Sequence, residues 1–129
     1  MDKRQVNPWT WQDRAGFSQA WRVDGPQSIV FVSGQVAVSA DGAPVGEDDF
    51  EAQVRQVFDN LQIVLGEAGA SLKDIVKLTV FLTDIGNLRE YTRIKGEFIT
   101  GQQPASTAVE VSSLALPGFM IEVEAIATV

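Results

Sequence analysis

Two carboxylates near the end of the chain are the residues whose type and spacing most clearly suggest chemistry. Glu122 and Glu124 alternate with apolar residues in the segment MIEVEAIA, residues 120–127. This alternation predicts a strand, and its period of two places both carboxylates on one face. A buried carboxylate is costly unless it has a partner or a shifted pKa. Each glutamate is therefore either a solvated or ion-paired structural residue or an acid with a function, and both interpretations stay open.

A second candidate lies where a predicted strand ends in Ser33 and Gly34. The Ser33 hydroxyl and the open backbone at Gly34 could orient a small ligand. The structural alternative is a β-bulge, and the segment taken alone favours it. Glu110 raises the same question as Glu122, and we interpret it as structural. The glycines follow no phosphate-binding pattern, and the aspartates have no metal-loop spacing.

The residue types that the chain lacks exclude several kinds of chemistry. It has no histidine and no cysteine. The commonest general base, the commonest metal ligand, the thiolate nucleophile and the disulfide are therefore all absent. Proton transfer is left to a carboxylate, a lysine, the single Tyr91 or water. We expect neither a metal site nor a cofactor.

The charge balance bears on possible partners. Ten basic residues stand against seventeen acidic ones, which gives a net charge of −7. Nucleic acid is bound mainly through basic side chains, so we expect no nucleic-acid partner. Helical Arg89, Arg93 and Lys95 are interpreted as a solvated face. No apolar run reaches the ~20 residues of a membrane span, and the first residues lack the apolar stretch of a signal peptide. We expect a cytoplasmic protein with no membrane partner.

Hydrophobic periodicity predicts the elements that position these residues. The chain of 129 residues suits one domain, residues 1–129. The clearest helix pattern is an apolar face of period 3.6 that ends before Gly69. After an irregular segment at 1–15, we expect strands at 17–23, 28–33, 75–82, 107–111 and 119–129, and helices at 48–68 and 87–99.

The order β-β-α-β-α-β-β predicts an α+β fold in which two helices cover one face of a single sheet. Strand residues on the second face are mostly apolar, and no further element of the chain is available to cover them. Another copy of the same chain is the simplest cover. We therefore expect a closed, symmetric homo-oligomer.

Blocks of sequence along nearly the whole chain match one known family in order and spacing. The blocks are GFSQA at 16–20, VSGQV at 32–36, QVRQVFDNLQIVLGEA at 53–68, DIVKLTVFLTD at 74–84, PA at 104–105, VEV at 109–111 and IEVEAIA at 121–127. With them the chain resembles the Rid family (reactive intermediate deaminase, also called YjgF or endoribonuclease L-PSP). The resemblance implies a chorismate-mutase-like fold and a homotrimer. Its sheets would form a barrel with the helices outside and ligand clefts between subunits.

The resemblance also implies roles for individual residues. Deaminase members of the family hydrolyse enamines and imines, such as 2-aminoacrylate, to a 2-keto acid and ammonia. Glu122 matches the family's glutamate on the last strand, which positions the attacking water. Phe17 stands where the family has a tyrosine, and Thr92 where it has an asparagine. The substrate-binding residues implied in this way are Phe17, Ser33, Gly34, Thr92, Ser106, Thr107 and Ala108.

Ser106 is the main departure from the family's pattern. In the deaminases an arginine just after the Pro-Ala pair clamps the substrate carboxylate, whereas Ser106 follows Pro104 and Ala105 here. Charge-assisted bonds of this kind contribute roughly 1.5–3 kcal/mol, and a serine cannot neutralise a carboxylate. The sequence therefore indicates a branch without the clamp, acting on a substrate less anionic than an amino-acid derivative.

Three functions follow as hypotheses. The leading one is hydrolysis of a small imine or enamine in clefts between subunits, with Glu122 acting on the water or the nitrogen. The first alternative is a non-catalytic homotrimer that binds small metabolites in the same clefts. The second is an endoribonuclease, against which the acidity, the absence of histidine and the absence of a basic, aromatic patch all count.

Overall fold

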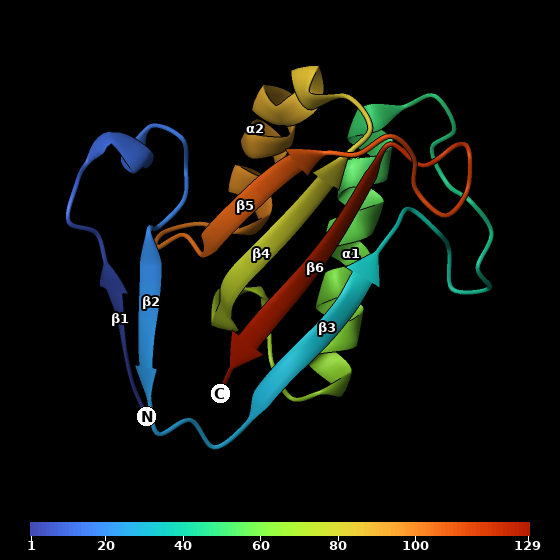
Figure 1. The fold of residues 1–129 in the computed structure, drawn as a ribbon. Coiled ribbons are helices and arrows are strands. Elements are labelled where there is room, and N and C mark those ends of the chain that lie inside the picture. Colours follow the sequence, from blue (N-terminus) through green and yellow to red (C-terminus); the bar gives the residue numbers. More distant parts are fainter.

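A four-stranded sheet carrying two helices on one face is the centre of the structure (Figure 1). The computed structural model describes residues 1–129. Its strands are β1 (Asp2–Val6), β2 (Ala20–Asp24), β3 (Ile29–Gln35), β4 (Ile75–Leu82), β5 (Ala105–Glu110) and β6 (Ile121–Thr128), and its helices are α1 (Phe50–Glu67) and α2 (Leu88–Phe98). Short 3₁₀ turns are η1 (Trp11–Asp13), η2 (Leu72–Asp74) and η3 (Ile85–Asn87). No helix is long and apolar enough to cross a membrane.

The strand order of this sheet is β3-β6-β4-β5. β6 lies antiparallel to both β3 and β4, while β4 and β5 are parallel. The parallel pair needs a crossover, and α2 supplies it between the two strands. Because β5 is last in the strand order, it is an edge strand. α2 lies close to that edge (Figure 1).

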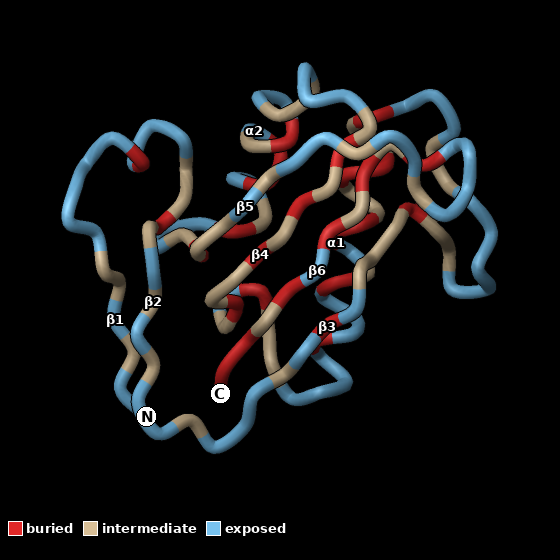
Figure 2. The backbone as a smooth tube through the Cα atoms, viewed as in Figure 1, coloured by how far each residue is buried: buried red, intermediate tan, exposed pale blue.

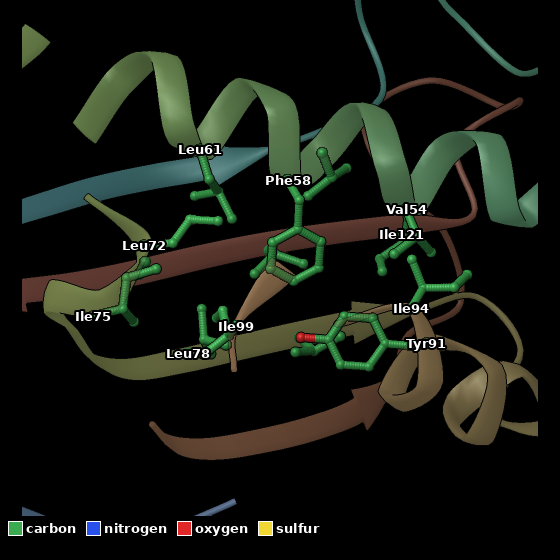
Figure 3. Packing of buried hydrophobic residues seen from close by; sticks show 14 of the residues in the cluster. Val54, Phe58, Leu61, Leu72, Ile75, Leu78, Tyr91, Ile94, Ile99 and Ile121 are labelled. Carbon is green, nitrogen blue, oxygen red and sulfur yellow. The ribbon is translucent and has the colours of Figure 1, made fainter. Parts of the chain in front are cut away.

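The core fills the layer between the helices and the sheet. Asp49 caps α1 by accepting a hydrogen bond from the Ala52 N–H at 3.0 Å, as short polar side chains do at helix starts. Phe58 stacks between Tyr91 and Phe98, at ring-centroid distances of 6.1 and 5.1 Å. Figure 3 shows side chains of α1, α2 and β4 meeting in this layer. Burying one such side chain contributes about 1.5–3 kcal/mol.

The opposite face of the sheet has no covering element (Figures 1 and 2). Ile29, Phe31 and Val109 are exposed to 51, 75 and 39%. The face is less uniformly apolar than the sequence predicted, because Glu122 and Glu124 lie on it too. Their neighbours Ile121 and Val123 point the other way, into the core. The predicted alternation of β6 is confirmed.

Two expectations about the beginning of the chain are wrong. Residues 1–15 were predicted to be irregular, but β1 pairs antiparallel with β2 from Asp2 to Val6. A single sheet was also predicted, whereas β1 and β2 form a separate two-stranded sheet beside β5 (Figure 1). The polar sequence DKRQV has none of the apolar alternation by which strands are recognised. All other elements lie within three residues of their predicted bounds.

Candidate functional site

A cleft of about 640 Å³ opens at the β5 edge of the sheet. Its walls come from α2, from β5, from η3 and from the segment between η1 and β2. Four of the substrate-binding residues implied by the resemblance line it, namely Phe17, Thr92, Ser106 and Ala108. They belong to three separate elements, so the fold brings together residues that are far apart in the sequence.

Ser18 holds the segment that carries Phe17 against the sheet. This serine is 1% exposed, and it forms an isolated parallel bridge with Ala105. Its N–H donates to the Pro104 carbonyl at 3.0 Å, and its hydroxyl donates to the Gln103 carbonyl at 2.5 Å. Phe17 is thereby fixed beside the start of β5, at the wall of the cleft.

Strand alternation decides which residues of β5 face the cleft. Ser106 and Ala108 are register partners of buried core residues of β4, so their side chains point to the helix-covered face. Thr107 points to the open face, where its hydroxyl accepts a hydrogen bond from the Lys77 ammonium at 2.7 Å. Thr107 therefore lies outside this cleft, although the resemblance groups it with Ser106 and Ala108.

Glu122 lies against the backbone of β3 on the open face. The register between β3 and β6 shifts between Val32 and Gln35, which confirms the predicted bulge at Gly34. A Cβ added at Gly34 would lie 1.9 Å from Oε2 of Glu122. Only a glycine leaves room for the carboxylate there. Ser33 is exposed at the same bulge.

The three candidate glutamates have different surroundings. Neither Glu122 nor Glu124 forms an ion pair, so ion pairing does not account for them. Glu122 is half-buried and Glu124 is exposed. Glu110 accepts a hydrogen bond from the Ile85 N–H at 3.0 Å. This bond ties the end of β5 to η3 and confirms the structural interpretation of Glu110.

The candidate residues of one chain thus form two groups. Phe17, Thr92, Ser106 and Ala108 line the cleft on the helix side of β5, whereas Ser33, Gly34, Thr107 and Glu122 lie on the open face. Glu122 pairs with Phe81 of β4, and Phe81 pairs with Val109 of β5. Two strand spacings, about 10 Å, and the thickness of the sheet therefore separate Glu122 from the cleft.

Three basic residues of the cleft were not predicted as site residues. Arg14 and Arg89 lie at the rim, and Lys95 lies inside. The expectation that Lys95 is part of a solvated face is wrong, because it is 3% exposed. It follows Tyr91 by four residues and so shares the inward face of α2, a spacing that could have revealed it. Burial lowers the pKa of Lys95 to about 8.

Tyr91 is a poor candidate for proton transfer. Its side chain is 2% exposed, and its hydroxyl points into the core (Figure 3) without a hydrogen-bond partner. Burial raises the pKa of this hydroxyl above its ordinary value. The chain also has no cluster of three or more side chains that could hold a metal ion. Carboxylates and lysines are the ionisable groups that remain for chemistry at the site.

These features define the class of protein as an α+β chain with one open sheet face and a cleft at a sheet edge. Residues 11–129 match the family model described as endoribonuclease L-PSP. The chain belongs to this family, which is also known as the Rid or YjgF family.

Proteins that are similar to this chain over most of its length support this membership. A RutC family protein of Pyrococcus abyssi is 37% identical over 86% of this chain and 84% of its own length. The RutC family protein YjgH of Escherichia coli is 43% identical over 78% of this chain and 76% of its own. The crystal structure of YyfB from Yersinia pestis, a Rid family protein described as of unknown function, superposes with a TM-score of 0.89. It is 34% identical, and the match covers all of both chains.

Proposed function

We propose that the chain hydrolyses small imines or enamines in clefts completed between the subunits of a homotrimer. The observation that carries this proposal is the position of Glu122, a half-buried carboxylate without an ion-pair partner, seated over Gly34 on the uncovered face of the sheet. Membership of a family that includes imine deaminases supports the proposal. The fold alone would not, because one fold serves many functions.

A second copy of the chain supplies what one copy lacks. The open face exposes Phe31 and Ile29, which a partner would cover. A partner seated there can place its own β5 edge, and the cleft beside it, close to Glu122. Each site would then combine the carboxylate of one subunit with the cleft of the next. The separation of the two groups within one chain supports this arrangement.

The chemistry requires one group that exchanges protons with water and with the substrate nitrogen. An enamine first becomes an imine, as its β-carbon takes up a proton and its nitrogen loses one. Water then adds to the C=N carbon and forms the C–O bond, while the nitrogen takes up a proton. The C–N bond of the resulting carbinolamine then breaks, and the products are a carbonyl compound and ammonia. Glu122 takes a proton from the attacking water and passes it to the nitrogen, and it then takes the hydroxyl proton of the carbinolamine and passes it to the departing nitrogen. Ser106 and Thr92 line the cleft, and in this proposal they orient the substrate by hydrogen bonds. The Thr92 hydroxyl already donates to the Leu88 carbonyl at 3.0 Å, so it would accept a bond from the substrate.

A coupled assay tests this proposal. An amino-acid oxidase generates 2-imino acids, an amine oxidase generates imines without a carboxylate, and semicarbazide trapping reports how much of each imine remains. We expect the wild-type protein to speed the loss of imine, and Glu122→Gln to slow that catalysis by roughly 100-fold or more, the usual contribution of a general acid–base. Glu124→Gln is the matched control, because Glu124 shares the strand and the face but is exposed. Equal rates for wild type and Glu122→Gln would remove Glu122 from the mechanism.

Binding without catalysis is the second candidate, and Ser106 favours it. The resemblance places Ser106 where the deaminases have their carboxylate-clamping arginine. A homotrimer that only binds metabolites in these clefts would leave the imine decay unchanged while still binding a small ligand. The same assay, accompanied by a binding titration, distinguishes the two functions.

A further inference from the structure

The cleft is locally basic in a chain of net charge −7. Arg14, Arg89 and Lys95 all line it. None of the three has a carboxylate within ion-pair distance, whereas Arg55 and Arg93 are each bonded to glutamates on the helices. Three cations without counter-ions around one cleft make it attractive to an anion.

Of the three basic residues, Lys95 gives the strongest indication that the cleft binds an anion. Its side chain is 3% exposed, and the hydrogen bond from its ammonium group goes to the carbonyl of Gly16, at 2.5 Å. Lysine is almost never fully buried without a charged partner, because removing an ammonium group from water is costly. A carbonyl carries only a partial charge and does not neutralise it. The missing countercharge is the group that a bound ligand would supply.

The other walls of the cleft are apolar. Phe17, Ile85 and Leu88 line it. Trp11 packs edge-on against Phe17 at a centroid distance of 5.7 Å, and it is 60% exposed. The volume of about 640 Å³ lies well within the range of sites for ligands much larger than a three-carbon acid. An aromatic or bulky aliphatic group would bury apolar surface against these walls, which is favourable.

We propose that this cleft binds an organic carboxylate that carries a large apolar group. The carboxylate lies on Lys95 with Arg14 and Arg89, and the apolar group lies against Phe17, Ile85 and Leu88. The inference rests on the proposed function, since it names the substrate class of the same cleft. Three cations from α2 and from the segment before β2 then replace a single arginine on β5.

This inference reverses one expectation drawn from the sequence. Ser106 indicated a substrate less anionic than an amino-acid derivative, because a serine cannot neutralise a carboxylate. Ser106 lies on β5, which forms only one wall of the cleft. The cleft has cations on its other walls, and Ser106 remains able to donate a hydrogen bond to the same ligand.

Isothermal titration calorimetry with three probes tests the proposal. Phenylacetate carries both features, phenylacetamide lacks the charge, and acetate lacks the apolar group. We expect phenylacetate to bind most tightly. Loss of one charge-assisted contact, in Lys95→Met or Arg14→Gln, should weaken phenylacetate by about 10- to 100-fold and leave phenylacetamide unchanged. Lys73→Met, at an exposed lysine outside the cleft, is the control and should change nothing.

Several results would overturn the proposal. They are equal affinity for phenylacetate and phenylacetamide, equal affinity for phenylacetate and acetate, or unchanged phenylacetate binding in both Lys95→Met and Arg14→Gln. Arg14 is exposed, so a change in Arg14→Gln cannot come from a disturbed core. Charge-dependent binding in a protein that hydrolyses no imine would support this inference and refute the proposed function, while imine hydrolysis without charge-dependent binding would do the reverse.

Discussion

Gly34→Ala should displace the carboxylate of Glu122 without disturbing the rest of the fold. The added Cβ would lie 1.9, 2.7 and 2.9 Å from Oε2, Cδ and Cγ of Glu122, and no other side chain is among its nearest neighbours. Non-bonded carbon atoms are at their most favourable separation at about 3.5–4.0 Å. Gly34 is not among the glycines with positive φ, so its backbone accepts an alanine without strain. The whole effect must therefore act through Glu122.

The size of the effect differs between stability and catalysis. Overpacking in a rigid site costs about 1–3 kcal/mol. The colliding atoms here belong to a flexible, half-buried side chain, so the lower end, about 1 kcal/mol, is expected. Catalysis depends more strongly on position, and a misplacement of about 1 Å can cost on the order of 100-fold in rate. We expect a folded protein with little imine hydrolysis.

A double-mutant cycle separates the collision with Glu122 from other effects of Gly34→Ala on stability. In urea unfolding, Gly34→Ala should cost about 1 kcal/mol more in the wild type than in a Glu122→Ala background, where the collision is absent. Gly66→Ala is the matched control, because Gly66 lies within α1 and a Cβ there meets nothing within 4 Å. This control should gain about 0.5–1 kcal/mol of stability and keep its rate. The same cost in both backgrounds, or a wild-type rate in Gly34→Ala, would refute the reasoning.

Three further predictions concern Lys95, the assembly and the charge. Burial lowers the pKa of Lys95 from 10.5 to about 8, so its charge destabilises the fold below pH 8 and this penalty fades as the pH rises from 8 towards 10.5. Lys95→Met should raise the free energy of unfolding by about 2 kcal/mol at pH 7, after the loss of the bond to Gly16, and by less at pH 9.5, whereas a constant gain in urea titrations would contradict it. Light scattering should report three times the chain mass of 14.0 kDa, and a stable monomer with native circular dichroism would refute the homotrimer. RNA should not be retained in a filter-binding titration at low salt, and saturable, salt-sensitive binding would restore the endoribonuclease hypothesis.

The elements with strong periodicity were predictable from the sequence. The apolar face of α1 and the β-branched run of β4 agree with the structure because core burial selects both patterns. β1 was not predictable in this way, since a polar strand of a two-stranded sheet has no apolar face to reveal it. The segment before β2 is tied to the main sheet by the bond from Ser18 to Gln103, a contact between residues far apart in the sequence.

Candidate residues could be named from the sequence and the resemblance, but not the way in which the fold arranges them. Alternation along β5 already implies that Ser106 and Thr107 point to opposite faces, and the structure agrees. The cations of the cleft were harder to find. Lys95 lies four residues after Tyr91, and this helical spacing was the one sign in the sequence that its side chain points inward. Arg14 lies in a segment without periodicity, and only the anchored loop places it at the cleft.

A site completed between subunits is the central claim, and mixed trimers test it most directly. Thr92→Trp fills the cleft with a bulky ring, and Glu122→Gln removes the carboxylate, so each variant alone should be inactive in imine hydrolysis. The two chains, coexpressed with different tags, are purified as trimers that contain both. In a closed ring of either mixed composition, one cleft in three pairs an intact cleft with an intact Glu122, so about one third of the wild-type activity should return. Mixed trimers as inactive as the two variants would show that cleft and carboxylate do not act together across subunits, and would contradict the account.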